Sequence, residues 1–157
     1  MAKKASSKAM TVRQASDQSE SLVVSFATAD DLDELAGVEP HPHMTRDILA
    51  DKIARRQVVV ARQGDRMVGH LRFSMFWDLI PFIDLLIVAP SLRREKIGTR
   101  LAMFLEDAMR SRGHRRVLTS SLSSEEGQKF FRAVGYVDAG CLLLPTEPLE
   151  ILFYKGI

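Results

Sequence analysis

The sequence predicts one domain of the α/β (α+β) class, in which about four helices flank a mixed, largely antiparallel β-sheet. Two observations lead to this fold class. Runs with strand and helix periodicity follow one another in the order β-α-α-β-β-β-α-β-α-β-β, without an internal repeat. In addition, the turn Gln63-Gly-Asp-Arg66 joins two strand-like runs, which is a strong signal for an antiparallel hairpin.

The composition is that of a soluble globular domain. The chain has 157 residues, of which 46% are hydrophobic and 27% charged, with a net charge of +2. No apolar run approaches the roughly 20 residues that span a bilayer, and the first residues lack the apolar stretch of a signal peptide. We therefore expect a cytoplasmic protein. Residues 1–21 contain no aromatic side chain and predict a disordered tail, which leaves 22–157 as the domain.

The first elements are a strand and two helices. A short strand begins at Leu22. Thr28 and Asp31 have the spacing of a capping box and predict the start of a helix, which Gly37 ends. A second helix is expected over 44–56.

Three strands follow. The hairpin predicts strands over 57–62 and 67–76, and Pro81 is expected to keep 77–80 out of a regular strand. The almost wholly apolar run 82–89 predicts a central strand of the sheet.

The remaining elements alternate between helix and strand. Apolar residues at helical spacing from Ile97 predict a helix that Gly113 ends, followed by a strand over 116–121. Ser123 or Ser124 is expected to cap the next helix. Two final strands are predicted over 136–144 and 149–154.

The candidate metal ligands do not form a set. His41 and His43 lie in one loop without a third ligand, and Cys141 has no His or Cys at zinc-ligand spacing. We expect no metal site, and we expect Cys141, within an apolar run, to be a core residue.

Charge is distributed unevenly along the chain. Between Leu92 and Arg116 there are eight basic and three acidic residues, whereas Ala29–Asp51 contains seven acidic residues and one basic. The basic stretch predicts a site for an anion, and the acidic stretch predicts either a solvated surface or a site for a cation.

The basic stretch begins where a predicted strand gives way to a helix. A helix N-terminus presents unpaired N–H groups and the positive end of the helix dipole, both of which attract phosphate. Gly98 would let the backbone approach a ligand closely, and nearby basic side chains add charge. Many α/β proteins share this arrangement, so the pattern alone does not identify a ligand.

Two motifs in this region resemble those of the GNAT superfamily of acetyltransferases, in an uncharacterised branch. The family loop Gln/Arg-x-x-Gly-x-Gly/Ala follows an apolar strand ending Val-x-Pro; here Val88-Ala-Pro90 precedes Arg93-x-x-Lys96-x-Gly98. The family's second signature, Asn-x-x-Ala-x-x-x-Tyr-x-x-x-Gly-Phe, is similar to Ser124-x-x-Gly127-x-x-x-Phe131-x-x-x-Gly135-Tyr136. The resemblance covers about 22–157 and implies an enzyme with the GNAT fold.

The resemblance implies an N-acetyltransferase that moves an acetyl group from acetyl-CoA to an amine by direct attack in a ternary complex. Backbone groups of Leu86 and Val88 would pair with the pantetheine arm, and amides from Arg94 to Thr99 would hold the pyrophosphate. The implied cofactor residues are Leu86, Ile87, Val88, Arg93, Arg94, Glu95, Lys96, Ile97, Gly98, Thr99, Arg100, Ser124, Gly127 and Phe131.

The expected catalytic groups differ from the family pattern, because Phe131 stands where the family often has the Tyr that protonates the departing thiolate. A thiol has a pKa of about 8.5, so the thiolate can leave without an acid, and Tyr136, Ser124 or water could substitute. Asp84 is the leading candidate for the base, because a carboxylate in a buried strand needs a reason. It is expected to share strand parity with Leu86 and Val88; the rival bases are Asp78, Glu150 and His70.

The acceptor is predicted to be a small cationic amine or the amino end of a peptide. Asp47 and Asp51 would lie on one face of the second helix and attract a cation. Trp77, Asp78 and Phe82 would line the pocket, since an aromatic face attracts a cation.

Two other functions fit parts of the sequence. A non-catalytic acyl-CoA-binding regulatory module would explain the missing Tyr. The basic run Arg110–Arg116 could bind RNA, but no aromatic residue is interleaved with its arginines, so we expect no nucleic-acid partner. We also expect no membrane partner, and a homodimer is possible within the family resemblance.

Overall fold

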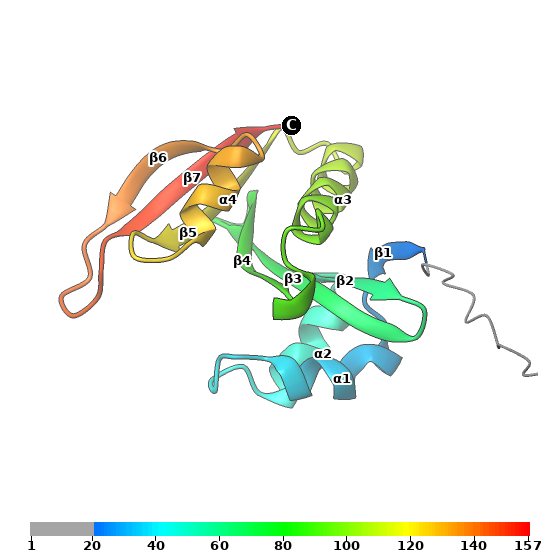
Figure 1. The fold of residues 1–157 in the computed structure, drawn as a ribbon. Helices are drawn as coiled ribbons and strands as arrows, with labels where there is room; N and C mark the ends of the chain where they lie inside the picture. The colour runs from blue at the N-terminus through cyan, green and yellow to red at the C-terminus, as the bar shows by residue number, and fades with distance from the viewer. Residues whose placement is uncertain (1–20) are drawn as a thin grey trace, which may run out of the picture.

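The computed structural model describes residues 21–157, which form a sheet with the strand order β1-β2-β3-β4-β5-β7-β6 (Figure 1). The expected disordered tail lies outside the described residues apart from its last position. The strands are β1 Leu22–Phe26, β2 Val58–Gln63, β3 Arg66–Phe76, β4 Ile80–Val88, β5 Arg116–Leu122, β6 Val137–Leu142 and β7 Glu150–Gly156. The helices are α1 Leu32–Val38, α2 Arg46–Ala54, α3 Ile97–Ser111 and α4 Gly127–Ala133.

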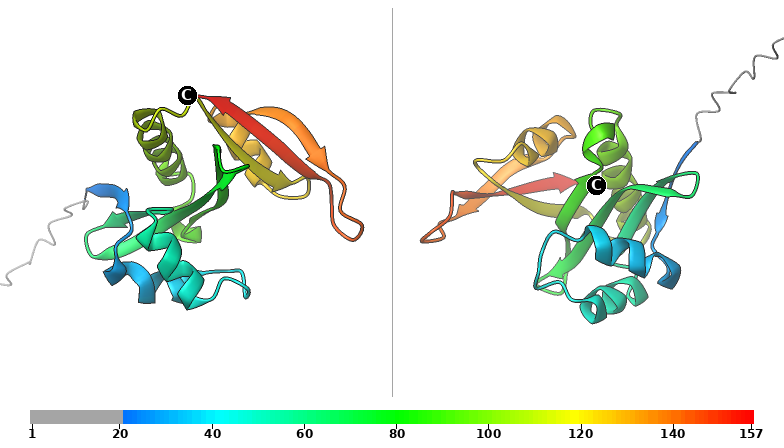
Figure 2. Two further views of the ribbon diagram at one scale, coloured as in Figure 1. Left: turned by 180° about the vertical axis from the view of Figure 1, so that it is seen from behind. Right: turned by 60° about the horizontal axis from the view of Figure 1, so that its bottom comes forward.

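The sheet is mixed, as predicted. All neighbouring strands are antiparallel except β4 and β5, which run parallel. Helices α1 and α2 cover one face of the sheet, and α3 and α4 lie on the other (Figures 1 and 2). The parallel pair requires the chain to cross over after β4, and α3 makes that crossover.

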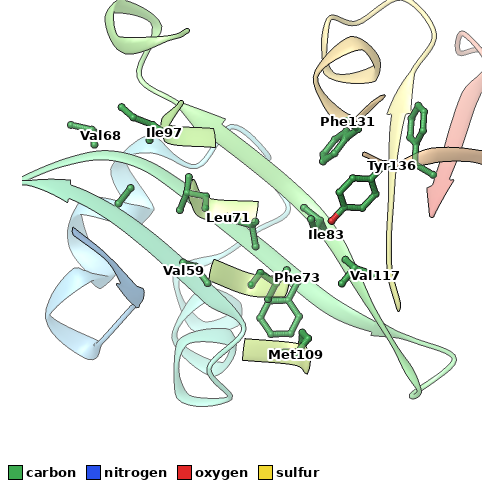
Figure 3. Packing of buried hydrophobic residues seen from close by; sticks show 14 residues of the cluster. Val59, Val68, Leu71, Phe73, Ile83, Ile97, Met109, Val117, Phe131 and Tyr136 are labelled. Atoms are coloured by element: carbon green, nitrogen blue, oxygen red, sulfur yellow. The ribbon is translucent and has the colours of Figure 1, made fainter. Parts of the chain in front are cut away.

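The main core lies between the sheet and α3. Helix α3 presents a stripe of buried apolar residues at helical spacing, which contact inward-facing residues of β3, β4 and β5 (Figure 3). A smaller cluster joins α1 and α2 to β2 on the other face. The sheet is therefore packed on both faces, with β4 contributing to the α3 side.

Several local predictions are confirmed and others are wrong. The Thr28 N–H donates to the Asp31 carboxylate at 2.7 Å, which completes the predicted capping box. Gly37 does not end α1, which continues to Val38 until Glu39 becomes extended. Neither Ser123 nor Ser124 caps α4, because that helix begins one turn later with Glu126 at its N-cap.

Pro81 lies inside β4, contrary to the prediction that the strand begins after it. It pairs with Met75 of β3, at a position where β4 has no hydrogen-bonding neighbour on its β5 side. A proline is tolerated there because its missing N–H would have no partner.

Cys141 is exposed, not a core residue. It lies in β6, the edge strand, where all six residues are exposed. The apolar run that contains Cys141 therefore belongs to an exposed edge strand and not to the core. None of the helices in 21–157 is long and apolar enough to cross a membrane.

Candidate functional site

Strands β4 and β5 diverge and leave a stretch of backbone without a strand partner. β3 pairs with β4 along its whole length, but β5 pairs only with Phe82 and Ile83. The Thr119 hydroxyl donates to the Ile83 carbonyl at 3.1 Å at the point where this pairing stops. Beyond it, the two strands separate (Figures 1 and 2). Since main-chain polar groups require partners, this edge is suited to an extended ligand that carries amides.

A β-bulge coincides with the start of this divergence. Phe73 pairs with Ile83 and Arg72 with Leu85, so Asp84 is the extra residue of β4. We had expected the side chains of Asp84 and Leu86 to lie on the same face of β4. The bulge places them on opposite faces. Leu86 packs with the α3 core, whereas the Asp84 side chain contacts groups on the α2 face. A bulge re-aims side chains and ends regular pairing, which is what happens here.

The loop between β4 and α3 has the backbone geometry of an anion site. Arg94 and Lys96 adopt positive φ values of 74° and 62°. The Arg100 N–H bonds to the Lys96 carbonyl, so the amides of residues 97–99 precede the first intrahelical bond of α3. These free donors, together with the helix dipole, favour a phosphate at this point.

The charges of the loop are available to a ligand. Arg93, Arg94 and Lys96 are exposed, and within residues 21–157 none of them forms an ion pair. Glu95 is exposed beside them. Arg100 is different, because its guanidinium donates to the Leu22 carbonyl at 3.0 Å and so contacts β1.

The backbone conformation at Lys96 is one that glycine, the residue of the GNAT motif at this position, adopts without cost. Its φ of 62° and ψ of 12° lie in the left-handed region, which costs an L-residue roughly 1–2 kcal/mol. The family's Gly avoids this cost, whereas Lys96 accepts it and contributes a positive charge.

Two glycines allow close packing around the divergence. A Cβ at Gly98 would lie 3.3 Å from both Leu86 and Phe130. Gly98 therefore lets α3 approach β4 and α4 closely. At Gly127, where the family has Ala, a Cβ would lie 2.8 Å from the Ser121 hydroxyl.

Phe131 and Tyr136 are core residues. Both are buried, and their rings make an edge-on contact with centroids 5.4 Å apart (Figure 3). The Tyr136 hydroxyl donates to Glu106 at 3.1 Å, and Lys155 donates to the other oxygen of Glu106 at 2.7 Å. Burial raises the pKa of Tyr136, and the neighbouring Glu106 raises it further. This hydroxyl is thus held as a neutral donor to Glu106, which speaks against the acid role expected for it.

A second polar group lies on the opposite face of the sheet, and the sequence analysis missed most of it. The Asp84 carboxylate accepts from Ser74 at 2.7 Å and from Lys52 at 3.3 Å. Lys52 also donates to the Phe73 carbonyl at 3.3 Å, next to the bulge. Helix α2 thus supplies a cation to the carboxylate that marks the divergence of β4 and β5.

Four further residues extend this polar layer. Glu39 forms a buried ion pair with Arg72, and the His41 ring lies 3.1 Å from Glu39. His70 is 2% exposed, and its Nε2 has no hydrogen-bond partner within residues 21–157. Burial lowers the pKa of His70 to about 4, so this ring is neutral at pH 7. The alternation of apolar and polar residues along β3 gives no signal for these contacts. They form only because the loop after α1, which carries Glu39 and His41, reaches Arg72 in β3.

The acidic stretch is largely neutralised within the chain. Five of its seven carboxylates form ion pairs, and Asp30 and Asp47 are the two without one in the described residues. The pairs are Asp31 and Glu34 with Arg62, Asp33 with Arg46, Glu39 with Arg72, and Asp51 with Arg55. Most of the negative charge of this stretch is therefore already paired within the chain.

The remaining candidates are distributed over several surfaces. Trp77 and Asp78 form the exposed turn between β3 and β4, and Phe82 stacks on Phe76. Glu150 starts β7 opposite Leu122, and Ser124 is exposed before α4. Trp77 lines a hollow that contains Arg115 and Arg116 but no acidic residue. The structure therefore does not place Trp77 in an acidic pocket with Asp47. Within residues 21–157, no three potential metal ligands lie together.

Comparison with known proteins agrees with this geometry. The model of the acetyltransferase (GNAT) family matches residues 23–136. A GNAT-family acetyltransferase from Bacillus cereus is 24% identical, with a TM-score of 0.70 over 87% of this chain and 97% of that one. Ard1 from Thermoplasma volcanium is 15% identical, with a TM-score of 0.74 over 87% of this chain and 97% of that one. The PaiA N-acetyltransferase from Thermoplasma acidophilum, solved with coenzyme A, is 15% identical, with a TM-score of 0.72 over 87% of this chain and 99% of that one.

Proposed function

This chain belongs to the GNAT family of acetyltransferases, and we propose that it transfers an acetyl group from acetyl-CoA to the nitrogen of an amine. The observation that carries the proposal is the divergence of β4 and β5 beside a basic loop at the start of α3. A thioester with a long amide arm and a pyrophosphate matches both parts of this site. Coenzyme A in the Thermoplasma acidophilum relative supports this choice of ligand.

We place the cofactor along β4 in extended form. Backbone groups of Leu86 and Val88 would pair with the pantetheine amides, as an added strand would. The amides from Arg94 to Thr99 would hold the pyrophosphate, with Arg93, Arg94 and Lys96 as counter-charges. Ile83 and Val88 lie five residue steps apart along β4, a length of about 16 Å at roughly 3.3 Å per step. The acetyl end would therefore lie near Asp84, where the two strands meet.

The reaction would proceed by direct attack. A neutral amine adds to the thioester carbonyl carbon, the C–S bond breaks, and the thiolate leaves with the electron pair. The amine proton passes to a base, and the thiolate takes a proton from water, because Phe131 has none to give and the Tyr136 hydroxyl is held by Glu106. We assign the base role to Asp84, with Lys52 and Ser74 positioning its carboxylate.

The acceptor in this proposal is a small amine or the amino end of a peptide. Asp47 is exposed in the first turn of α2, and no other residue in 21–157 forms an ion pair with it. Its charge is therefore available to a cation. Because most neighbouring acids are already paired, Asp47 is the one residue of the predicted acidic pair to which we assign a steering role.

The test is a thiol-release assay with a panel of amines and peptides. Asp84→Asn should lower kcat by about 10²–10⁴-fold, the contribution of general-base catalysis, while the Kd for acetyl-CoA stays unchanged. Asp51→Asn, which removes an exposed carboxylate of α2 that pairs with Arg55, is the control. Unchanged turnover in Asp84→Asn would remove Asp84 from the mechanism. Tight binding of acetyl-CoA without turnover of any amine would instead indicate a regulatory acyl-CoA-binding module.

A further inference from the structure

The turn between β3 and β4 exposes a tryptophan in a costly conformation. Trp77 and Asp78 have φ values of 53° and 58°, where hairpin turns normally carry Asn-Gly. A bulky residue is an outlier in this region, and such conformations concentrate at ligand sites. The Phe76 ring, 4.6 Å from Trp77 between centroids, supports the indole, which is nevertheless 74% exposed. The turn therefore presents a flat apolar surface to solvent.

The loop after α3 supplies cations beside this indole. Trp77 lines a hollow of about 440 Å³ together with Leu79, Ile80, Gly113, His114, Arg115 and Arg116. Arg115 and Arg116 are exposed, and neither forms an ion pair within the described part of the chain. Their backbone is fixed, since Arg116 pairs with Gly156 and the Arg115 carbonyl accepts from Ile157.

From this arrangement we propose that the hollow binds an unpaired nucleotide, with its base stacked on Trp77 and its phosphate held by Arg115 and Arg116. Stacking on aromatic rings beside a cationic backbone groove is how single-stranded nucleic acids are bound without sequence preference. The hollow lies within the range of small-ligand pockets, roughly 300–1,000 Å³. It adjoins Ile80, at the opposite end of β4 from the loop proposed for the pyrophosphate. The two sites are therefore separate.

The fold removes the objection that the sequence raised against nucleic acid. The basic run Arg110–Arg116 contains no aromatic residue, but the β3–β4 turn brings Trp77 beside it. An anionic membrane suits the same cations less well. Asp78 lies at the turn between Trp77 and Leu79, and inserting both apolar side chains would carry a carboxylate into the lipid. A nucleotide in the hollow leaves Asp78, which does not line it, in water.

Trp77 is the only tryptophan of the chain, so its fluorescence reports directly on the hollow. The full chain is titrated with an eight-nucleotide oligo(A), with AMP and with phosphatidylserine vesicles. We expect saturable quenching by oligo(A) that weakens with added salt. Tighter binding of oligo(A) than of AMP would assign single-stranded nucleic acid, and equal affinities would assign a free nucleotide; either outcome supports the site. No quenching by either, or a response to vesicles alone, would overturn it.

Two variants separate the site from general charge effects. Arg115→Gln/Arg116→Gln should raise the Kd for oligo(A) at least about tenfold, whereas Arg55→Gln/Arg66→Gln, which removes the same charge elsewhere, should not. Trp77→Gly suits the positive φ and does not threaten the fold. In this variant, labelled oligo(A) should lose affinity by fluorescence anisotropy, while acetyl-CoA affinity is retained. Unchanged oligo(A) affinity in both site variants would contradict the proposal.

Discussion

Glu39 and Arg72 form a two-pronged ion pair in which each side chain is only 4% exposed. Arg72 donates from Nε to Oε2 at 2.9 Å and from Nη2 to Oε1 at 3.1 Å. Burial alone would raise the pKa of Glu39, but the hydrogen bonds and charge of Arg72 hold it below its ordinary value. Because Arg72 pairs with Leu85 beside the bulge, the ion pair fixes the loop after α1 to the sheet next to the candidate site.

Breaking this pair should destabilise the protein strongly. Arg72→Met leaves the Glu39 carboxylate buried without a counter-charge, which costs about 3–5 kcal/mol. Urea unfolding measures the change in the free energy of unfolding. Arg55→Met breaks the exposed pair with Asp51 and should cost less than about 1 kcal/mol. Equal effects of the two variants would show that the Glu39–Arg72 pair is not buried in solution.

The stability of the protein should fall as the pH is lowered through the range set by His70. Burial lowers its pKa to about 4, and Arg72 adds to this effect against the opposing charge of Glu39. An unfolded histidine has a pKa of about 6.5, so between these values the unfolded chain binds a proton that the folded chain does not. Linkage then predicts a loss of up to about 3 kcal/mol between pH 7 and pH 4.

Urea unfolding at pH 7 and pH 5 tests the assignment to His70. The loss of stability should shrink in His70→Gln, which cannot titrate, and persist in His43→Gln, which changes an exposed histidine. The same pH dependence in wild type and His70→Gln would assign the effect to another group.

Gly127 should show a measurable coupling to Ser121. Gly127 is the first residue of α4 and has no positive φ, so Gly127→Ala should gain about 0.4–1 kcal/mol by restricting the unfolded chain. The added Cβ, however, would lie 2.8 Å from the Ser121 hydroxyl. We therefore expect little or no gain in wild type and a gain of about 1 kcal/mol in the Ser121→Ala background. Thermal or urea unfolding of the four proteins in this double-mutant cycle measures the coupling. Additive effects would mean that the two residues do not compete for space.

Local sequence patterns predicted the elements that carry the proposed cofactor site. The helical spacing from Ile97, the hairpin at Gly64 and the strand before Pro90 each depend on neighbours in sequence, and the structure has all three. The capping box at Thr28 is confirmed for the same reason. Motif similarity then identified the family, which the match over 23–136 confirms.

Contacts between distant segments could not be predicted in this way. The bulge at Asp84 reverses an expectation based on strict alternation, because one extra residue in β4 turns a side chain to the other face. Tyr136 is a candidate proton donor by its place in the motif, yet Glu106, 30 positions earlier, holds its hydroxyl. The one signal of this contact in the sequence was the position of Glu106 among the apolar residues on the buried side of α3. Trp77 and Arg115 come together only through the fold.

The central claim is that the loop before α3 binds the phosphates of coenzyme A while the edge of β4 binds its arm. Isothermal titration with acetyl-CoA and with S-acetylpantetheine, which lacks the phosphates, separates these two contributions. In Arg93→Gln/Arg94→Gln, the Kd for acetyl-CoA should rise at least about tenfold, equivalent to 1.4 kcal/mol, and the Kd for S-acetylpantetheine should not change. Equal acetyl-CoA affinity in the folded variant and the wild type would contradict the claim.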